Sequence, residues 1–321
     1  MKKRVEKLQA LIKDFDCLIV TAPEDIFYYT GYTPLEDDGS VLVVLERGAR
    51  LFTTQNGFQT KTASVQITTM EKASDFIDFV KNYRIAGFDE DTLLSRSFLK
   101  LRKHIKLKPA SGIIKQPRMI KDAKELAALR KAIALTKRAF KLKLSGTEAA
   151  SAAEIDCFFK RNGAESAFPT IFASGTNSGN VHHRPGNRKR GNRDLVIVDI
   201  GAKINGYCAD MSRTLCRSPG KREKKLIVTV KNIQEQLIDF IKPGMKLSEV
   251  QSEYEKLMKP NKVFHYFGHG VGLNIHEAPR KNDVLKENMI ITVEPGIYIR
   301  NFGGCRIEDM VIIKKRAELI S

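Results

Sequence analysis

Two aspartates lie where the sequence otherwise indicates a buried β-hairpin. The stretch VIVDIGAKINGYCADMS spans residues 196–212, and Asp199 and Asp210 flank its Asn-Gly dipeptide. Asn-Gly between apolar runs is the strongest short signal for a two-residue type I′ turn. With that turn, Asp199 faces Ser212, and the two carboxylates become diagonal neighbours on one face, with Cα atoms roughly 7–8 Å apart.

This arrangement predicts a cation between the two acids. Two bare carboxylates that point the same way repel each other, and burial increases the cost of keeping both ionised. The sequence puts no lysine or arginine on that face of the hairpin to neutralise them. A metal ion is the simplest group that would stabilise both charges.

The C-terminal stretch TVEPGIYIRNFGGCRIEDMV repeats the pattern. If residues 300–304 form its loop, Glu294 faces Met310 and Glu308 faces Gly296. The two glutamates are then again a diagonal pair, although a loop of this length fixes the register less tightly than an Asn-Gly turn. The sequence therefore predicts a second acid-bearing hairpin.

Four carboxylates and one histidine would make an oxygen-rich site for two divalent ions. Hydrolytic aminopeptidases and phosphatases use two ions about 3.5–4 Å apart in this way. Oxygen ligands with one imidazole favour Mn²⁺, Co²⁺, Fe²⁺ or Zn²⁺ over the metals of thiolate sites. Five of the six histidines fall in the same part of the chain: His182, His183, His265, His269 and His276.

Each of these features also has an ordinary structural explanation. A single Asp in a strand is most often an edge or turn residue, and a lone His is more often a hydrogen-bonded structural group than a ligand. The segment GHGVGLNIHE is not a G-x-G-x-x-G loop, so it does not predict dinucleotide binding. The metal hypothesis depends on the two hairpins and the histidines together.

Composition indicates a globular cytoplasmic protein of two domains. The chain has 321 residues, of which 42% are hydrophobic and 29% charged. No apolar run reaches the roughly 18 residues of a membrane helix, and the N-terminus lacks the apolar core of a secretory signal. The five cysteines are scattered without a C-x-x-C pair, which favours reduced thiols in the cytosol.

The net charge of +18 leaves two explanations open. One is nucleic-acid binding. The other, which we favour, is a lysine-rich solvated surface, because the lysines are spread along the chain and no basic stretch is interleaved with aromatic residues. The densest basic cluster, residues 184–193, is an expected exposed loop. It could border the mouth of the site, or it could simply be solvated.

The N-terminal domain is expected to span residues 1–115. It alternates strands and helices, with strands predicted at 17–20 and 40–46 and a helix at 74–83. Residues 109–118 contain two prolines and a glycine and predict a linker.

The C-terminal domain is expected to span residues 116–321 with an α+β fold. Asp122 is a predicted cap for a helix that runs to about residue 140. Thr147 is the predicted cap of a second helix, which Gly163 ends. The site hairpins and a further amphipathic helix follow.

Four segments in this order carry a family resemblance: VDIGAKINGYCADMSRT, GHGVGLNIHEAP, TVEPGIYI and GGCRIED. They resemble the pita-bread metallopeptidases, which include methionine aminopeptidase, aminopeptidase P and prolidase, over residues 117–315. The resemblance implies two divalent ions, manganese first, with cobalt, zinc or iron as alternatives. It implies that Asp210 and Glu308 bridge the ions. The full implied ligand set is Asp199, Asp210, His269, Glu294 and Glu308.

The resemblance also implies roles for residues around the ions. Glu294 would take a proton from the attacking water, and His182 and His276 would hydrogen-bond the developing oxyanion. His265 would help bind substrate by lining a proline pocket, and Arg306 matches an arginine that braces the ligand acids. His183, the neighbour of the catalytic histidine, is expected to be an ordinary polar residue.

The N-terminal domain favours one branch of the family. Methionine aminopeptidases mostly lack such a domain, whereas residues 27–44 resemble a segment of the creatinase-like domain of aminopeptidase P and prolidase. We therefore predict a Xaa-Pro aminopeptidase that acts on peptides and forms a homodimer. The alternatives are a prolidase, which cleaves Xaa-Pro dipeptides, and a metal-free homologue that binds peptide or nucleic acid.

Overall fold

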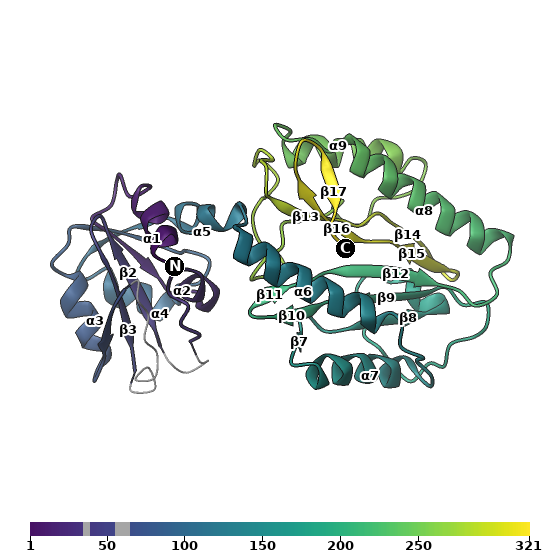
Figure 1. Ribbon diagram of the computed structural model, residues 1–321, viewed down its shortest axis with the longest axis horizontal. Helices are drawn as coiled ribbons and strands as arrows, with labels where there is room; N and C mark the ends of the chain where they lie inside the picture. The colour runs from purple at the N-terminus through teal and green to yellow at the C-terminus, as the bar shows by residue number, and fades with distance from the viewer. Residues whose placement is uncertain (35–38, 55–64) are drawn as a thin grey trace. The chain divides into compact units, whose positions relative to one another are not determined.

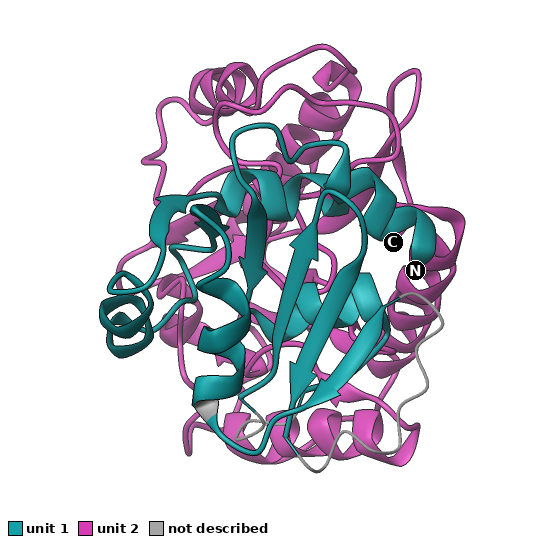
Figure 2. Ribbon diagram, turned by 90° about the vertical axis from the view of Figure 1, so that its left-hand side faces the viewer, with its two compact units in different colours: residues 1–118 teal, residues 119–321 magenta. Residues whose placement is uncertain are grey.

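The chain folds into two compact units in the computed structural model, residues 1–118 and 119–321 (Figure 2). The structure describes residues 1–34, 39–54 and 65–321. Each unit has its own hydrophobic core, so each is described separately.

The described residues of unit 1 form a six-stranded mixed sheet, in the order β4-β3-β2-β1-β5-β6 (Figure 1). Strand β1 pairs antiparallel with β2 and parallel with β5. The strands are β1 (Cys17–Val20), β2 (Val41–Leu45), β3 (Ala49–Thr53), β4 (Gln66–Thr69), β5 (Ile85–Phe88) and β6 (Lys106–Pro109). The helices are α1 (Lys2–Gln9), α2 (Pro23–Thr30), α3 (Ala73–Val80), α4 (Ser95–Leu101) and α5 (Ser111–Met119).

The linker predicted over residues 109–118 is wrong, because most of it forms helix α5. The Glu90 carboxylate accepts hydrogen bonds from the backbone N–H of Ser111 at the start of this helix. Near its end, the carbonyl of Pro117 accepts a hydrogen bond from Tyr28. Side chains from elsewhere in unit 1 thus satisfy the polar groups that an isolated Pro-containing segment would leave exposed.

The first half of unit 2 packs two helices on short antiparallel strands. Helices α6 and α7 share one core with β8, β9 and β10. The elements are α6 (Ala123–Ala139), α7 (Glu148–Arg161), β7 (Glu165–Ser166), β8 (Ile171–Ser174), the 3₁₀ helix η2 (Gly175–Gly179), β9 (Val196–Ile200), β10 (Ala202–Ile204), β11 (Tyr207–Cys208) and β12 (Met211–Leu215).

The second half repeats this organisation with a separate core. Helices α8 and α9 pack on β13, β14 and β16. The elements are α8 (Lys221–Phe240), α9 (Leu247–Leu257), β13 (Ile290–Val293), β14 (Gly296–Ile299), β15 (Gly303–Arg306), β16 (Asp309–Ile313) and β17 (Ala317–Leu319). In Figure 1, α7 lies below the strands, α8 and α9 lie above them, and α6 runs across them in this view.

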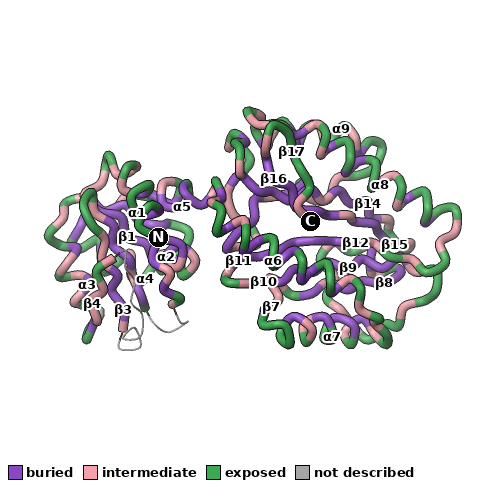
Figure 3. The backbone as a smooth tube through the Cα atoms, in the orientation of Figure 1, coloured by how far each residue is buried: buried purple, intermediate pink, exposed green. Residues whose placement is uncertain are grey.

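Strands of the two halves meet at a buried seam (Figure 3). The backbone N–H of Glu308 donates to the carbonyl of Ser212 at 3.0 Å. The N–H of Arg306 donates to the hydroxyl of Thr214, also at 3.0 Å. These bonds join β12 of the first half to the β15–β16 ribbon of the second, so the two acid-bearing hairpins lie against each other.

Most predicted elements are confirmed. Asp122 caps α6 by accepting from two backbone N–H groups, and Thr147 caps α7 by accepting from Ala150 N–H. Of the segment compared with creatinase-like domains, residues 27–30 end α2 and residues 41–44 belong to β2, while residues 35–38 lie outside the described residues. No helix in the described parts of the chain combines the length and the apolar character needed to cross a membrane.

Candidate metal centre

The first hairpin has the predicted register. Ile204 pairs with Tyr207, and Asp199 pairs with Ser212. The two turn residues have φ values of 51° and 82°, which is the left-handed backbone that a type I′ turn requires at both positions. Asp199 therefore lies on β9, and Asp210 lies directly before β12, as the sequence predicted.

The second hairpin closes more tightly than predicted. Ile299 pairs with Gly303, so the loop is residues 300–302 and not 300–304. Asn301 adopts φ 59°, a conformation that Asn tolerates better than most residues. A three-residue loop is thus possible where the sequence indicated five residues.

The shorter loop changes which residues face each other. Glu294 was predicted to face Met310, but Val293 pairs with Asp309. One position closer to the loop, Glu294 and Glu308 therefore lie opposite each other. Because side chains alternate with a period of two, this two-residue correction keeps both acids on the predicted face. It also brings them closer together than a diagonal pair.

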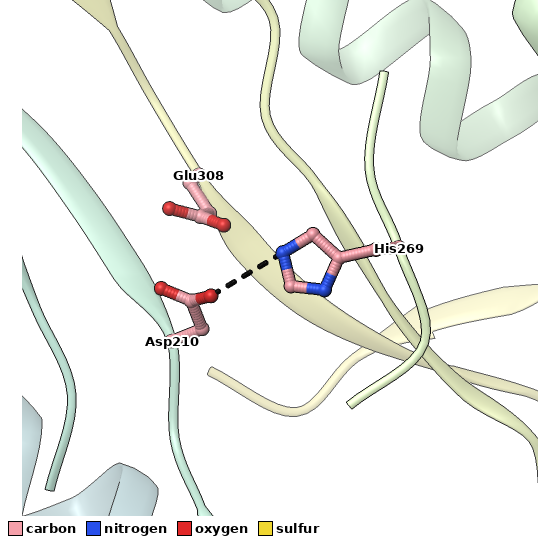
Figure 4. A group of neighbouring side chains, drawn as sticks. All are labelled: Asp210, His269 and Glu308. Atoms are coloured by element: carbon pink, nitrogen blue, oxygen red, sulfur yellow. Dashed lines mark ion pairs between the residues drawn. The ribbon is translucent and has the colours of Figure 1, made fainter. Parts of the chain in front are cut away.

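Three of the expected ligands converge on one point. Ligand atoms of Asp210, His269 and Glu308 all lie within 4.8 Å of one another (Figure 4). His269 lies in the segment before β13, and its Nε2 is 3.5 Å from Asp210 Oδ2 and 3.5 Å from Glu294 Oε1. Acids from both hairpins thus surround one imidazole nitrogen.

The hydrogen bonds of His269 fit a metal ligand. Its Nδ1 lies 3.1 Å from the carbonyl of Gly270, which requires an N–H at Nδ1. Nε2 then faces two carboxylates and can approach them only with a proton on it or with a cation between the groups. A backbone carbonyl that holds Nδ1–H is the usual support for a metal-binding Nε2.

Burial of the acids disfavours their charged forms. It raises the pKa of Asp210 to about 6, raises that of Glu294 to about 7 and raises that of Glu308 well above its ordinary value. Charges of neighbouring acids add to these shifts, and Asp199 contributes to all three. For His269, burial alone would lower the pKa, but Asp210 and Glu294 raise it to about 9.

Arg306 only partly compensates this negative charge. Its Nη2 lies 2.6 Å from Asp199 Oδ2, and its Nε donates to the hydroxyl of Ser212. Ser212 in turn donates to Glu308 Oε2 at 2.9 Å. The other oxygen of Asp199, Oδ1, is buried without a hydrogen-bond partner among the described residues. An unpaired buried carboxylate oxygen beside further acids fits a divalent ion.

The expected second set of histidines lines the same cavity. This cavity has a volume of about 810 Å³, and its walls include all five expected ligands together with His182, His265, His276 and Arg306. The ring of His276 lies 4.1 Å from that of His269. The charge of His182 contributes to lowering the pKa of both His265 and His276, and all three side chains line the cavity.

Tyr298, a residue for which the sequence predicted no role, links His265 to Arg306. Arg306 Nη1 donates to the tyrosine hydroxyl at 2.8 Å, so the hydroxyl can donate its own proton to His265 Nε2 at 3.0 Å. His265 Nδ1–H then donates to the carbonyl of Tyr266. Burial, with the charges of Arg306 and His182, lowers the pKa of His265 to about 4, so this ring is neutral.

The basic loop over residues 184–193 only partly borders the site. Arg184 lines the cavity. Arg188 pairs with Asp194 at 2.9 Å, and Arg190 donates to the carbonyl of Leu144. These two arginines attach the loop to neighbouring residues of unit 2.

The sequence comparisons agree across both units. The pattern of metallopeptidase family M24 matches residues 124–315, and that of the creatinase/prolidase N-terminal domain matches residues 4–120. A Xaa-Pro dipeptidase of Pyrococcus furiosus is 32% identical over 335 residues, covering 98% of this chain and 95% of that protein.

The structure comparisons point the same way. A prolidase of Pyrococcus horikoshii OT3 superimposes with a TM-score of 0.92 and 28% identity, covering 99% of this chain and 97% of that one. An X-Pro aminopeptidase of Thermotoga maritima superimposes with a TM-score of 0.86 and 26% identity, covering 97% of each chain. Both units thus keep the fold of proline-specific peptidases.

Burial of Asp210, with repulsion from neighbouring acids, makes a prediction about metal-free protein. An unfolded Asp titrates near pH 4, whereas folded Asp210 titrates at about 6. Between pH 4 and pH 6 the folded chain therefore binds more protons at this residue than the unfolded chain does. The free energy of unfolding falls as pH rises through this range, and it stays lower above pH 6. With chelator at pH 8, Asp210→Asn should therefore raise the free energy of unfolding, by on the order of 1–3 kcal/mol.

Urea unfolding between pH 4 and pH 8 measures this effect. The gain from Asp210→Asn should be largest at pH 8 and fade toward pH 4. The exposed Asp239 supplies the control, Asp239→Asn, which should change little at any pH. A destabilised Asp210→Asn protein at pH 8 would contradict the prediction and show that the lost pairing with His269 outweighs the relief of burial and repulsion.

Proposed function

The chain belongs to metallopeptidase family M24, and from this premise we propose that it is a Xaa-Pro dipeptidase, or prolidase. The comparisons favour this alternative over the Xaa-Pro aminopeptidase that the sequence predicted. Two relatives named Xaa-Pro dipeptidase each match 98% of the chain, and several of the similar solved structures are prolidases or dipeptidases. The X-Pro aminopeptidase of Thermotoga maritima supports the second candidate.

The observation that carries the proposal is the lining of the cavity. Besides the carboxylates, the histidines and Arg306, three further basic side chains line it: Arg184, Arg280 and Lys281. A dipeptidase must bind a free carboxylate one residue beyond the bond it cleaves. Basic side chains that line the same cavity as the expected ligands supply suitable donors for such an anion.

The proposed ligands are the five that the sequence named. Asp199, Asp210, His269, Glu294 and Glu308 would hold two divalent ions, with Asp210 and Glu308 shared. Divalent ions held there supply Lewis acidity, which lowers the pKa of a water molecule and polarises a carbonyl group. The oxygen-rich set with one imidazole suits manganese, with cobalt, iron and zinc as alternatives.

The remaining side chains bind substrate and move protons. Glu294 faces the cluster and is the proposed group that takes a proton from water and delivers it to the leaving nitrogen. His182 and His276, which line the cavity, would donate hydrogen bonds to the carbonyl oxygen as its negative charge develops. Neutral His265, fixed by Tyr298, presents a flat ring that can pack against proline.

The assembly and cellular location are proposed from the resemblance to the family. A homodimer in the cytoplasm is expected, with peptide as the substrate and neither nucleic acid nor membrane as a partner. Sedimentation of the purified chain tests the first of these statements, because a dimer has twice the chain mass of 36.2 kDa.

The substrate class is tested with two peptides. Manganese-loaded enzyme should hydrolyse a Xaa-Pro dipeptide with a kcat/KM at least about tenfold above that for the Xaa-Pro-Xaa tripeptide, which corresponds to one charged hydrogen bond of about 1.5 kcal/mol. A matched Xaa-Ala dipeptide controls for the requirement for proline. A preference for the tripeptide would favour the aminopeptidase instead.

The basic side chains that line the cavity make a separate prediction. Neutralising the residue that binds the substrate carboxylate should raise KM for the dipeptide by about 10–100-fold and leave the dipeptide amide little affected. Arg184→Gln, Arg280→Gln and Lys281→Gln should be measured one at a time. Lys189→Gln is the control, because Lys189 is exposed on the same basic loop but does not line the cavity. Equal KM values for all four variants would contradict this assignment.

A further inference from the structure

A buried carboxylate outside the cavity lining organises the segment that carries His182. Glu148 is 1% exposed. Its Oε1 accepts hydrogen bonds from the N–H and the hydroxyl of Ser174, both at 2.7 Å, and from Asn177 at 3.1 Å. Its Oε2 accepts from His183 Nε2 at 2.7 Å and from the N–H of Gly186 at 3.2 Å. The Glu148 side chain thus holds both ends of residues 174–186, the segment that carries His182.

The environment keeps Glu148 ionised. Burial raises the pKa of this carboxyl, but hydrogen bonds from Ser174 and His183 outweigh burial and lower it. Glu148 is also the first residue of α7, where the helix dipole favours a negative charge. Because an ionised carboxylate can only accept hydrogen bonds, His183 Nε2 must carry the proton.

His182 lies between two anchored neighbours. On one side, the carbonyl of Val181 accepts a hydrogen bond from Arg306 Nη1 at 3.2 Å. On the other side, Glu148 holds the ring of His183. The His182 ring itself has no hydrogen bond to any residue in the described ranges, and it lines the cavity. The backbone is therefore fixed on both sides while the ring stays available to substrate.

Strand β15 of the second ribbon also contacts this segment. Gly304 N–H donates to the hydroxyl of Ser178 at 2.8 Å. A Cβ on Gly304 would lie 2.2 Å from the carbonyl oxygen of Ser178, so only glycine allows this approach. The segment that carries His182 is thus packed against the β15 strand that leads to Arg306.

We propose that Glu148 and His183 are a positioning pair that sets the place of the His182 ring over the reacting carbonyl. This inference rests on the proposed function, which gives His182 its hydrogen bond to substrate. Neither Glu148 nor His183 needs to touch substrate for this role. A shift of about 1 Å in such a group can cost about 10²-fold in rate, so the pair should affect kcat more than KM.

A double-mutant cycle separates positioning from general structural support. His183→Ala should lower kcat for a Xaa-Pro dipeptide by about 10–100-fold, with KM and manganese affinity close to wild type. His183→Gln keeps an N–H donor for Glu148 and should recover most of that loss. In a chain that already carries His182→Ala, adding His183→Ala should lower kcat little further, because the group that it positions is absent.

The opposite results overturn the inference. If the two substitutions lower kcat multiplicatively, or if His183→Gln is as impaired as His183→Ala, His183 does not act through His182. If His182→Ala has wild-type kcat, the proposed role of His182 in catalysis fails and the positioning role fails with it. Thermal unfolding of each variant with manganese identifies any that lose kcat by unfolding.

If the wild-type chain cleaves no proline peptide, NMR of the His182 ring still tests the positioning contact, because it does not require activity. That result would end the proposed function but not the positioning contact. The NMR signal of the His182 ring should then shift or broaden in His183→Ala and stay near its wild-type position in His183→Gln. An unchanged signal in His183→Ala would show that the pair does not position the ring.

Discussion

Repulsion among buried carboxylates is the constraint that the catalytic unit has to accommodate. Acids from two β-ribbons lie against one imidazole nitrogen, and burial, together with the charges of neighbouring acids, raises the pKa of Asp210, Glu294 and Glu308. One arginine pairs with Asp199 and reaches Glu308 only through Ser212. Buried charges at this density are costly unless each is paired. A divalent cation held among these acids would supply that pairing.

The fold holds the acids in place although they repel. Each half of unit 2 has its own core of helices on strands, and the seam between the halves is joined by backbone hydrogen bonds. The acids therefore cannot move apart without breaking a packed interface. Tight turns and close glycine contacts, such as that of Gly304 with Ser178, add to this rigidity. The acids lower the free energy of unfolding, and the packing of the surrounding structure compensates for that loss.

Local chemistry determined how much could be predicted from the sequence. An Asn-Gly turn allows one register, so the pairing of Asp199 with Ser212 could be derived. The second hairpin has no such turn, and a three-residue loop with Asn301 in the left-handed region was missed. Helix α5 was missed because Tyr28 and Glu90 stabilise it from distant positions. His183 was set aside as an ordinary polar residue because its partner Glu148 is 35 positions away.

Anomalous X-ray scattering from a manganese-soaked crystal tests the central claim most directly. The account predicts manganese peaks within bonding distance of Asp210, His269 Nε2 and Glu308, with a second peak nearby that reaches Asp199. Peaks that are absent from this cluster while manganese binds elsewhere on the chain would contradict the account. Protons would then neutralise the carboxylates, and the two hairpins would converge without forming a metal site.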